Sequence, residues 1–168
     1  MIYIGLIIAF ITSFQLNGQD SNNLEFLDRI NDIRTNKGLD PLLYDEELFI
    51  LAKKWCKFII TEIKVYSDSS ILAIANVDKD YFHIKANERF DIVLKRKEIV
   101  SIGENLMFSI NTKEKNNIVA AAFNGWKHST SHYLQMVNPK KTHVAYYSCY
   151  DNAKRRYVCI SVYAKKRA

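Results

Sequence analysis

The stretches Ile102-Gly103-Glu104-Asn105-Leu106 and Trp126-Lys127-His128-Ser129-Thr130-Ser131-His132-Tyr133 hold the densest polar chemistry among the apolar residues of this chain. The Gly-Glu-Asn step closes one segment and opens another, so it predicts a bend that fixes the Glu104 carboxylate. The second stretch offers an aromatic anchor, a hydroxyl at Ser129 and an imidazole at His132. We expect the rest of the chain to be organised around these two stretches.

Apolar residues at helical spacing predict the helices on either side of these stretches. The expected helices cover residues 23–36, residues 45–64 with Asp45 as the cap, residues 87–96, and a segment from Asn116 or Asn117 to residue 127 or 128. The last of these is expected to end before Ser129, which leaves Ser129 to His132 in the turn beyond it. Residues 71–75 fit a helical turn and a strand equally well.

The strand predictions fall in the second half of the chain. Residues 106–110 have a strand-like pattern, and residues 142–150 and 156–164 flank a polar segment with β-branched and aromatic residues on both sides. Such a pattern predicts a hairpin that closes the fold.

Length and composition bound the fold class and the partners. The chain has 168 residues, 48% of them hydrophobic, which suits one domain with its own core. Its formal net charge is +6 and its pI is near 9.1. The basic clusters are scattered over expected turns without interleaved aromatic residues, so the pattern predicts no nucleic-acid partner.

The amino-terminal segment predicts export from the cytoplasm. Residues 2–14 form an apolar run, and no charged side chain occurs before Asp20. The run is shorter than a bilayer-spanning helix and is followed by small and polar residues, so residues 1–18 are expected to be a cleaved signal peptide. The alternative is an uncleaved anchor. With either outcome, residues 22–168 would form an extracellular domain without a transmembrane segment.

The three cysteines fit an oxidising compartment. If the predicted hairpin turns at Lys154, Cys149 and Cys159 lie opposite each other at a separation compatible with a disulfide. The alternative is two free thiols, which an oxidising compartment disfavours. Cys56 falls in a helical pattern and is expected to be a buried free thiol.

Several motifs occur in a fixed order along the chain: Ile30-Asn31-Asp32-Ile33-Arg34, Gly38-Leu39-Asp40-Pro41-Leu42, Leu48 to Trp55, Gly103-Glu104-Asn105-Leu106, Trp126 with Ser129 and His132, Asn138-Pro139, and Tyr157-Val158-Cys159. This ordered set resembles the CAP superfamily, also called SCP-like extracellular domains, which includes cysteine-rich secretory, venom allergen and plant pathogenesis-related proteins. The resemblance covers nearly the whole chain after the leader. It implies an α+β fold: a three-layer α-β-α sandwich with a central antiparallel sheet.

The resemblance also implies a surface cavity in which histidines and glutamates gather. Glu104 matches the glutamate of the family's Gly-Glu-Asn motif, and His132 matches the histidine that follows the tryptophan. His83 matches the other histidine, with an alignment of residues 66–67 as the alternative, and Asn105 and Ser129 complete the expected cavity. Ser129 stands where many eukaryotic members have a second glutamate, which favours the compact bacterial-type pattern.

Two imidazoles with a carboxylate suit zinc or another divalent cation, so His83 and His132 are the expected metal ligands. We therefore expect a secreted, monomeric, non-enzymatic protein that binds a divalent metal, or a lipid or sterol, and acts on an extracellular partner. One alternative is a metal-assisted hydrolase or peptidase that uses Glu104 with both histidines. Another is a hydrogen-bonded cluster that only stabilises the fold.

Overall fold

The computed structural model describes residues 18–63, 66–71, 83, 90–91, 93–95, 98–109 and 117–167. Nearly all of the predicted leader lies outside these residues, as do residues 72–75 and 84–89. The signal-peptide prediction, the choice between helix and strand for residues 71–75 and most of the predicted helix at 87–96 are therefore not addressed by the structure.

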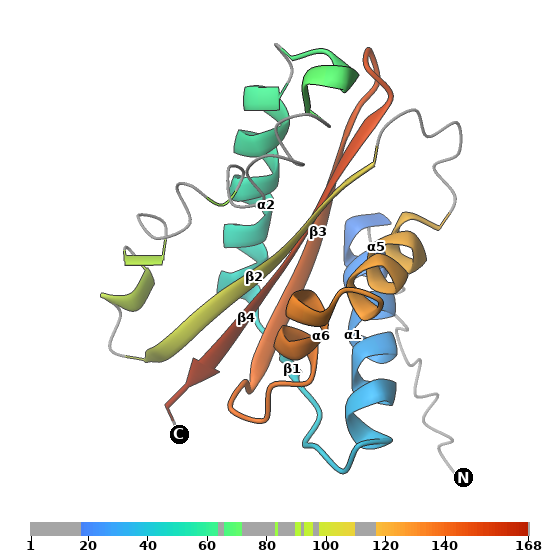
Figure 1. The fold of residues 1–168 in the computed structure, drawn as a ribbon. Helices are drawn as coiled ribbons and strands as arrows, with labels where there is room; N and C mark the ends of the chain where they lie inside the picture. Colours follow the sequence, from blue (N-terminus) through green and yellow to red (C-terminus); the bar gives the residue numbers. More distant parts are fainter. Residues whose placement is uncertain are drawn as a thin grey trace, which may run out of the picture.

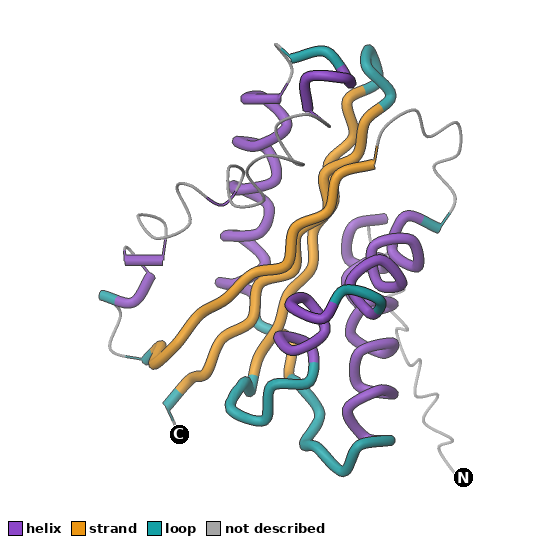
Figure 2. The backbone as a smooth tube through the Cα atoms, in the orientation of Figure 1, coloured by secondary structure: helices purple, strands orange, loops and turns teal. Residues whose placement is uncertain are grey.

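A four-stranded sheet runs through the centre of the described fold. Its strands lie in the order β1 (Leu43–Tyr44), β3 (His143–Asp151), β4 (Arg156–Lys166) and β2 (Ile99–Ser109). Both long pairings are antiparallel, and only the two-residue β1 runs parallel to its neighbour β3. The long strands lie side by side as a twisted ribbon (Figure 2). The predicted closing hairpin is confirmed as β3 and β4.

Helices cover both faces of this sheet. One face carries α2 (Glu46–Glu62), and the other carries α1 (Gly18–Thr35), α5 (Ile118–Lys127) and α6 (Thr130–Met136) (Figure 1). Each interface holds its own cluster of buried apolar side chains. The predicted α+β sandwich of three layers is confirmed. Within the described residues, no helix is both long enough and apolar enough to cross a bilayer.

Helix α2 follows directly from its local sequence. Asp45 accepts a hydrogen bond from the Leu48 backbone N–H at 2.9 Å, and acidic Glu46 and Glu47 occupy the first turn, where the helix dipole favours negative charge. Trp55 is 5% exposed and belongs to the core cluster. The predicted cap and core face of this helix are confirmed.

The first helix begins earlier than its sequence pattern predicts. Helix α1 starts at Gly18 instead of residue 23. The side chain of Asn23 is buried, and its Oδ1 accepts a hydrogen bond from the Tyr146 backbone N–H at 2.7 Å. Asn23 therefore connects α1 to β3 from within the helix and does not mark its start.

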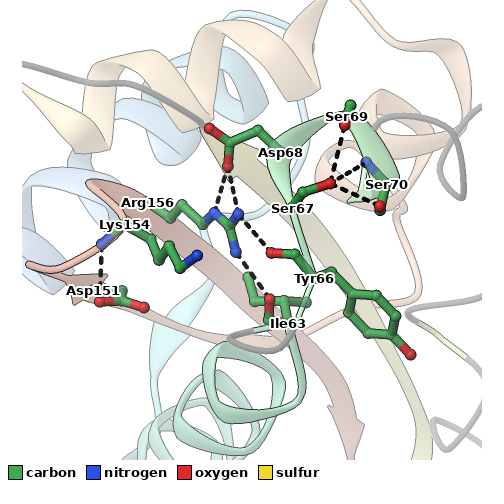
Figure 3. A network of polar contacts seen from close by, with 9 residues as sticks. All are labelled: Ile63, Tyr66, Ser67, Asp68, Ser69, Ser70, Asp151, Lys154 and Arg156. Carbon is green, nitrogen blue, oxygen red and sulfur yellow. Dashed lines mark hydrogen bonds and ion pairs between the residues drawn. The ribbon is translucent and has the colours of Figure 1, made fainter.

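Two buried arginines join segments that are distant in sequence. Arg34 donates to backbone carbonyls of Asp40, Met136 and Asn138 at 2.8 to 3.0 Å. Arg156 donates to the carbonyls of Ile63 and Tyr66 and pairs with Asp68 (Figure 3). Arg34 thus connects α1 to the segment after α6, and Arg156 connects the start of β4 to the end of α2.

The predicted disulfide between Cys149 and Cys159 is wrong: the two residues are not opposite each other in the hairpin, and both are free thiols. Asp151 pairs with Arg156, so the hairpin register places Cys149 opposite Val158 instead of Cys159. A shift of one residue in a strand turns a side chain to the other face of the sheet. Accordingly, Cys149 packs against the α2 side and Cys159 is buried on the opposite side.

Candidate functional site

Glu104 lies in the middle of a strand. The predicted bend at Gly103-Glu104-Asn105 is wrong, because all three residues pair in antiparallel register with β4, Glu104 opposite Val162. The glycine serves close packing and not a turn. A Cβ on Gly103 would lie 2.8 Å from the Gln135 side-chain oxygen, so its absence lets α6 approach the strand.

His132 lies in the first turn of α6. Ser129 precedes the helix in an extended conformation, and its carbonyl accepts the Tyr133 backbone N–H at 2.8 Å. The prediction that Ser129 to His132 form a turn is therefore wrong from Thr130 onwards, because α6 begins there. The Ser129 hydroxyl lies 2.9 Å from His132 Nδ1, so Ser129 orients the imidazole ring.

The structure brings His83 and Glu104 into direct contact. Nδ1 of His83 lies 2.8 Å from Oε1 of Glu104. The Glu104 side chain is only 2% exposed, whereas the His83 side chain is 27% exposed. In its ionised form the Glu104 carboxylate can only accept a hydrogen bond, and His83 Nδ1 is then the donor in this pair. Residues 66 and 67, the alternative match, make other contacts: the Tyr66 carbonyl accepts from Arg156, and the Ser67 hydroxyl contacts those of Ser69 and Ser70.

His132 lies on α6, and its imidazole interacts electrostatically with His83. Burial lowers the pKa of its imidazole below the ordinary value, and the neighbouring charge of His83 lowers it further. The ring is therefore neutral at pH 7, which is the state that binds metals. With Nδ1 of both histidines engaged by Ser129 and Glu104, Nε2 is the remaining nitrogen on each ring.

Asn105 joins the strand to the helix that carries His132. It is fully buried, and its Nδ2 donates to the His132 carbonyl at 3.1 Å and to the Tyr163 hydroxyl at 3.4 Å. The Ser161 hydroxyl donates to the same Tyr163 oxygen at 3.0 Å. Ser161 and Tyr163 are absent from the predicted site, although polar groups within an apolar strand pattern were a usable signal.

The expected metal set is only partly assembled. Within the described residues, no three His, Cys, Asp or Glu side chains are grouped so that they could hold a metal ion. Zinc binding by His83 and His132 stays a prediction. A cavity of about 350 Å³ lies elsewhere, lined by Ile60 and Thr61 of α2 and residues 150–153 at the hairpin turn.

An α-β-α sandwich with a histidine and a glutamate in contact beside its sheet defines an SCP-like domain. The model of the cysteine-rich secretory protein family, CAP, matches residues 27–163. The chain belongs to the CAP family. A comparison with curated proteins finds no match.

Solved structures with the same fold come from distant relatives. An outer surface protein from Borrelia burgdorferi is 15% identical with a TM-score of 0.64, covering 88% of this chain and 94% of that chain. An extracellular SCP-domain protein from Bacillus anthracis is 18% identical with a TM-score of 0.58, covering 88% and 41%. NaASP2, in a crystal structure with Zn²⁺, is 16% identical with a TM-score of 0.55, covering 88% and 81%. Such identities show the shared fold alone.

Proposed function

We propose that this CAP-family protein is secreted, acts by binding and not by catalysis, and takes a divalent cation such as zinc at its histidine–glutamate cluster. The observation that carries the proposal is the contact between His83 and the buried Glu104, and the His132 imidazole, neutral at pH 7, interacts electrostatically with His83. Export is supported by the apolar leader-like segment and by the secretory description of the family.

The donor set fits zinc. Neutral imidazole nitrogens are ordinary zinc ligands, and hydrogen bonds to the opposite ring nitrogen orient such ligands. His83 and His132 would hold the ion through Nε2, and Glu104 and Ser129 would orient the rings. NaASP2 was crystallised with Zn²⁺, which supports the same ion here. Two imidazoles leave coordination positions open, so we expect modest affinity.

Calorimetric titration of zinc tests this proposal. The wild-type protein should bind, and His132→Ala should lose binding. His128→Ala is the matched control, because His128 is exposed and its Nδ1 contacts the Asn124 carbonyl outside the cluster. Absence of binding to the wild-type protein, or equal binding by all three proteins, would remove the metal proposal.

Two further measurements separate the other hypotheses. Hydrolysis of peptide or ester panels by the zinc-loaded protein, lost in Glu104→Gln, would favour the metal-assisted hydrolase. Retention of a radiolabelled sterol on a filter would favour a lipid ligand. If zinc, lipid and turnover are all absent, protein partners remain, and the cluster serves the fold.

A further inference from the structure

Two of the three free cysteines lie on the same side of the sheet. The Sγ of Cys56, in the middle of α2, donates to the Val158 carbonyl at 3.1 Å. Val158 is the register partner of Cys149 on β3. Cys56 and Val158 belong to the same buried cluster, and Cys149 packs against it. The hydrogen bond and the strand register therefore bring Cys56 next to the position of Cys149 on the α2 side of the sheet.

We propose that Cys56 and Cys149 form an intramolecular disulfide that connects α2 to β3 when a disulfide oxidant such as oxidised glutathione is present. The two thiols lose two protons and two electrons, and the oxidant is reduced to two thiols. The bond would join a helix to the sheet that it covers, where neither strand pairing nor helix hydrogen bonds provide a connection. The inference does not depend on metal binding.

The exposures of the two thiols determine the order of the exchange. Cys149 is partly exposed, whereas Cys56 is fully buried. The oxidant therefore reacts first at Cys149, forming a mixed disulfide and releasing one thiolate. The thiolate of Cys56 then attacks the Cys149 sulfur and displaces the second thiolate. Burial raises the pKa of the Cys56 thiol, so this second step should accelerate as the pH rises.

Cys159 is the internal control. It is fully buried in the cluster on the opposite side of the sheet, with Phe26 and Trp126. Its neighbour across the hairpin is Ser148, not Cys149. A side chain on the other face of a strand cannot reach Cys56 without a change of register. Cys159 should therefore stay reduced under conditions that oxidise the other two.

The bond would also constrain the candidate site. Residues 57–148 lie inside the loop that it closes, and this segment includes Glu104 and His132. Cross-linking distant residues stabilises the fold mainly by restricting the unfolded chain, and the effect grows with loop length. A strain-free bond here should raise the melting temperature by roughly 5–10 °C.

Oxidation of the whole protein tests the inference. The protein is equilibrated in glutathione redox buffers, quenched with acid, alkylated and mapped by mass spectrometry without reduction. The expected result is a peptide linking Cys56 to Cys149, with Cys159 alkylated and the melting temperature raised. Cys149→Ser should abolish both changes, and Cys159→Ala should keep both.

Two results would overturn it. One is alkylation of Cys56 and Cys149 in every buffer, including fully oxidised glutathione at about pH 8.5. The other is a link from Cys149 to Cys159 or to a second chain. The disulfide map of the wild-type protein is sufficient to decide between these outcomes, so the test does not depend on whether each variant folds.

Discussion

His83 Nδ1 lies 2.8 Å from Glu104 Oε1, although the two residues are 21 positions apart and come from different parts of the fold. The carboxylate is 2% exposed, so its interaction with the imidazole is poorly screened by solvent. A double-mutant cycle with His83→Ala and Glu104→Met should give a coupling energy of about 1 kcal/mol or more. Urea unfolding of the four proteins measures it. A control cycle that combines Glu104→Met with His128→Ala, at an exposed histidine, should give a coupling energy of zero within error.

His132 should titrate below the ordinary histidine pKa, because burial and the His83 charge both disfavour its protonated form. The unfolded chain then binds the proton first on acidification. Stability is therefore lost as the pH falls below about 6.5, until the lower native pKa is reached. Imidazole NMR signals follow the titration directly. In His83→Ala the pKa of His132 should move partly back upwards, and a native value at or above about 6.5 would contradict this account.

Lys141 should make stability rise in alkaline solution. Its side chain is 5% exposed, its Nζ donates to Ser101 Oγ at 3.1 Å, and burial lowers its pKa to about 8. Between pH 8 and 10.5 the native state gives up this proton while the unfolded chain keeps it. Lys141→Met should therefore be stabilising at about pH 7, with an advantage that shrinks towards about pH 10. Urea midpoints of both proteins across that range provide the measurement, and a constant difference would count against it.

Arg34 should be among the most costly residues to replace. Arg34 is 1% exposed, and its guanidinium donates to the carbonyls of four residues beyond α1. Arg34→Met leaves these buried acceptors without a donor, so we expect a loss of about 3–5 kcal/mol. Arg29→Met is the control, because its ion pair with Glu25 is exposed and should be worth less than about 1 kcal/mol. Similar losses in both variants would show that the buried network contributes little.

Gly103 should tolerate alanine better than valine. A Cβ at this position meets the end of the flexible Gln135 side chain at 2.8 Å, which can move away. Gly103→Ala should cost about 1 kcal/mol or less, and Gly103→Val about 1–3 kcal/mol. Gln135→Ala should reduce the cost of both substitutions. Chemical denaturation of the single and double variants tests this. If Gln135→Ala leaves the stability loss of the Gly103 substitutions unchanged, the strand backbone, and not Gln135, restricts the side chain at this position.

Local patterns in the sequence predicted the elements whose signals are contained within one segment. Asp45 before an acidic first turn and a repeating apolar face defined α2, and alternating β-formers defined the closing hairpin. The apolar helical pattern that ends before Ser129 also predicted the end of α5. The segment after it, which includes His132, is a second helix and not a turn. These elements arise from propensity and period, which nearest neighbours in sequence determine.

The tertiary structure alone decided the strand registers and the side-chain contacts, because both depend on pairing between distant segments. The register of β4 against β3 separated Cys149 from Cys159, and its register against β2 made a strand of the predicted bend at Glu104. The contact of Glu104 with His83 and the hydrogen bond from Cys56 to the Val158 carbonyl likewise join segments with no local signal in common. The sequence alone determined the family resemblance, the layers and the candidate residues. Their contacts required the fold, because register and packing are set by the sum of long-range interactions.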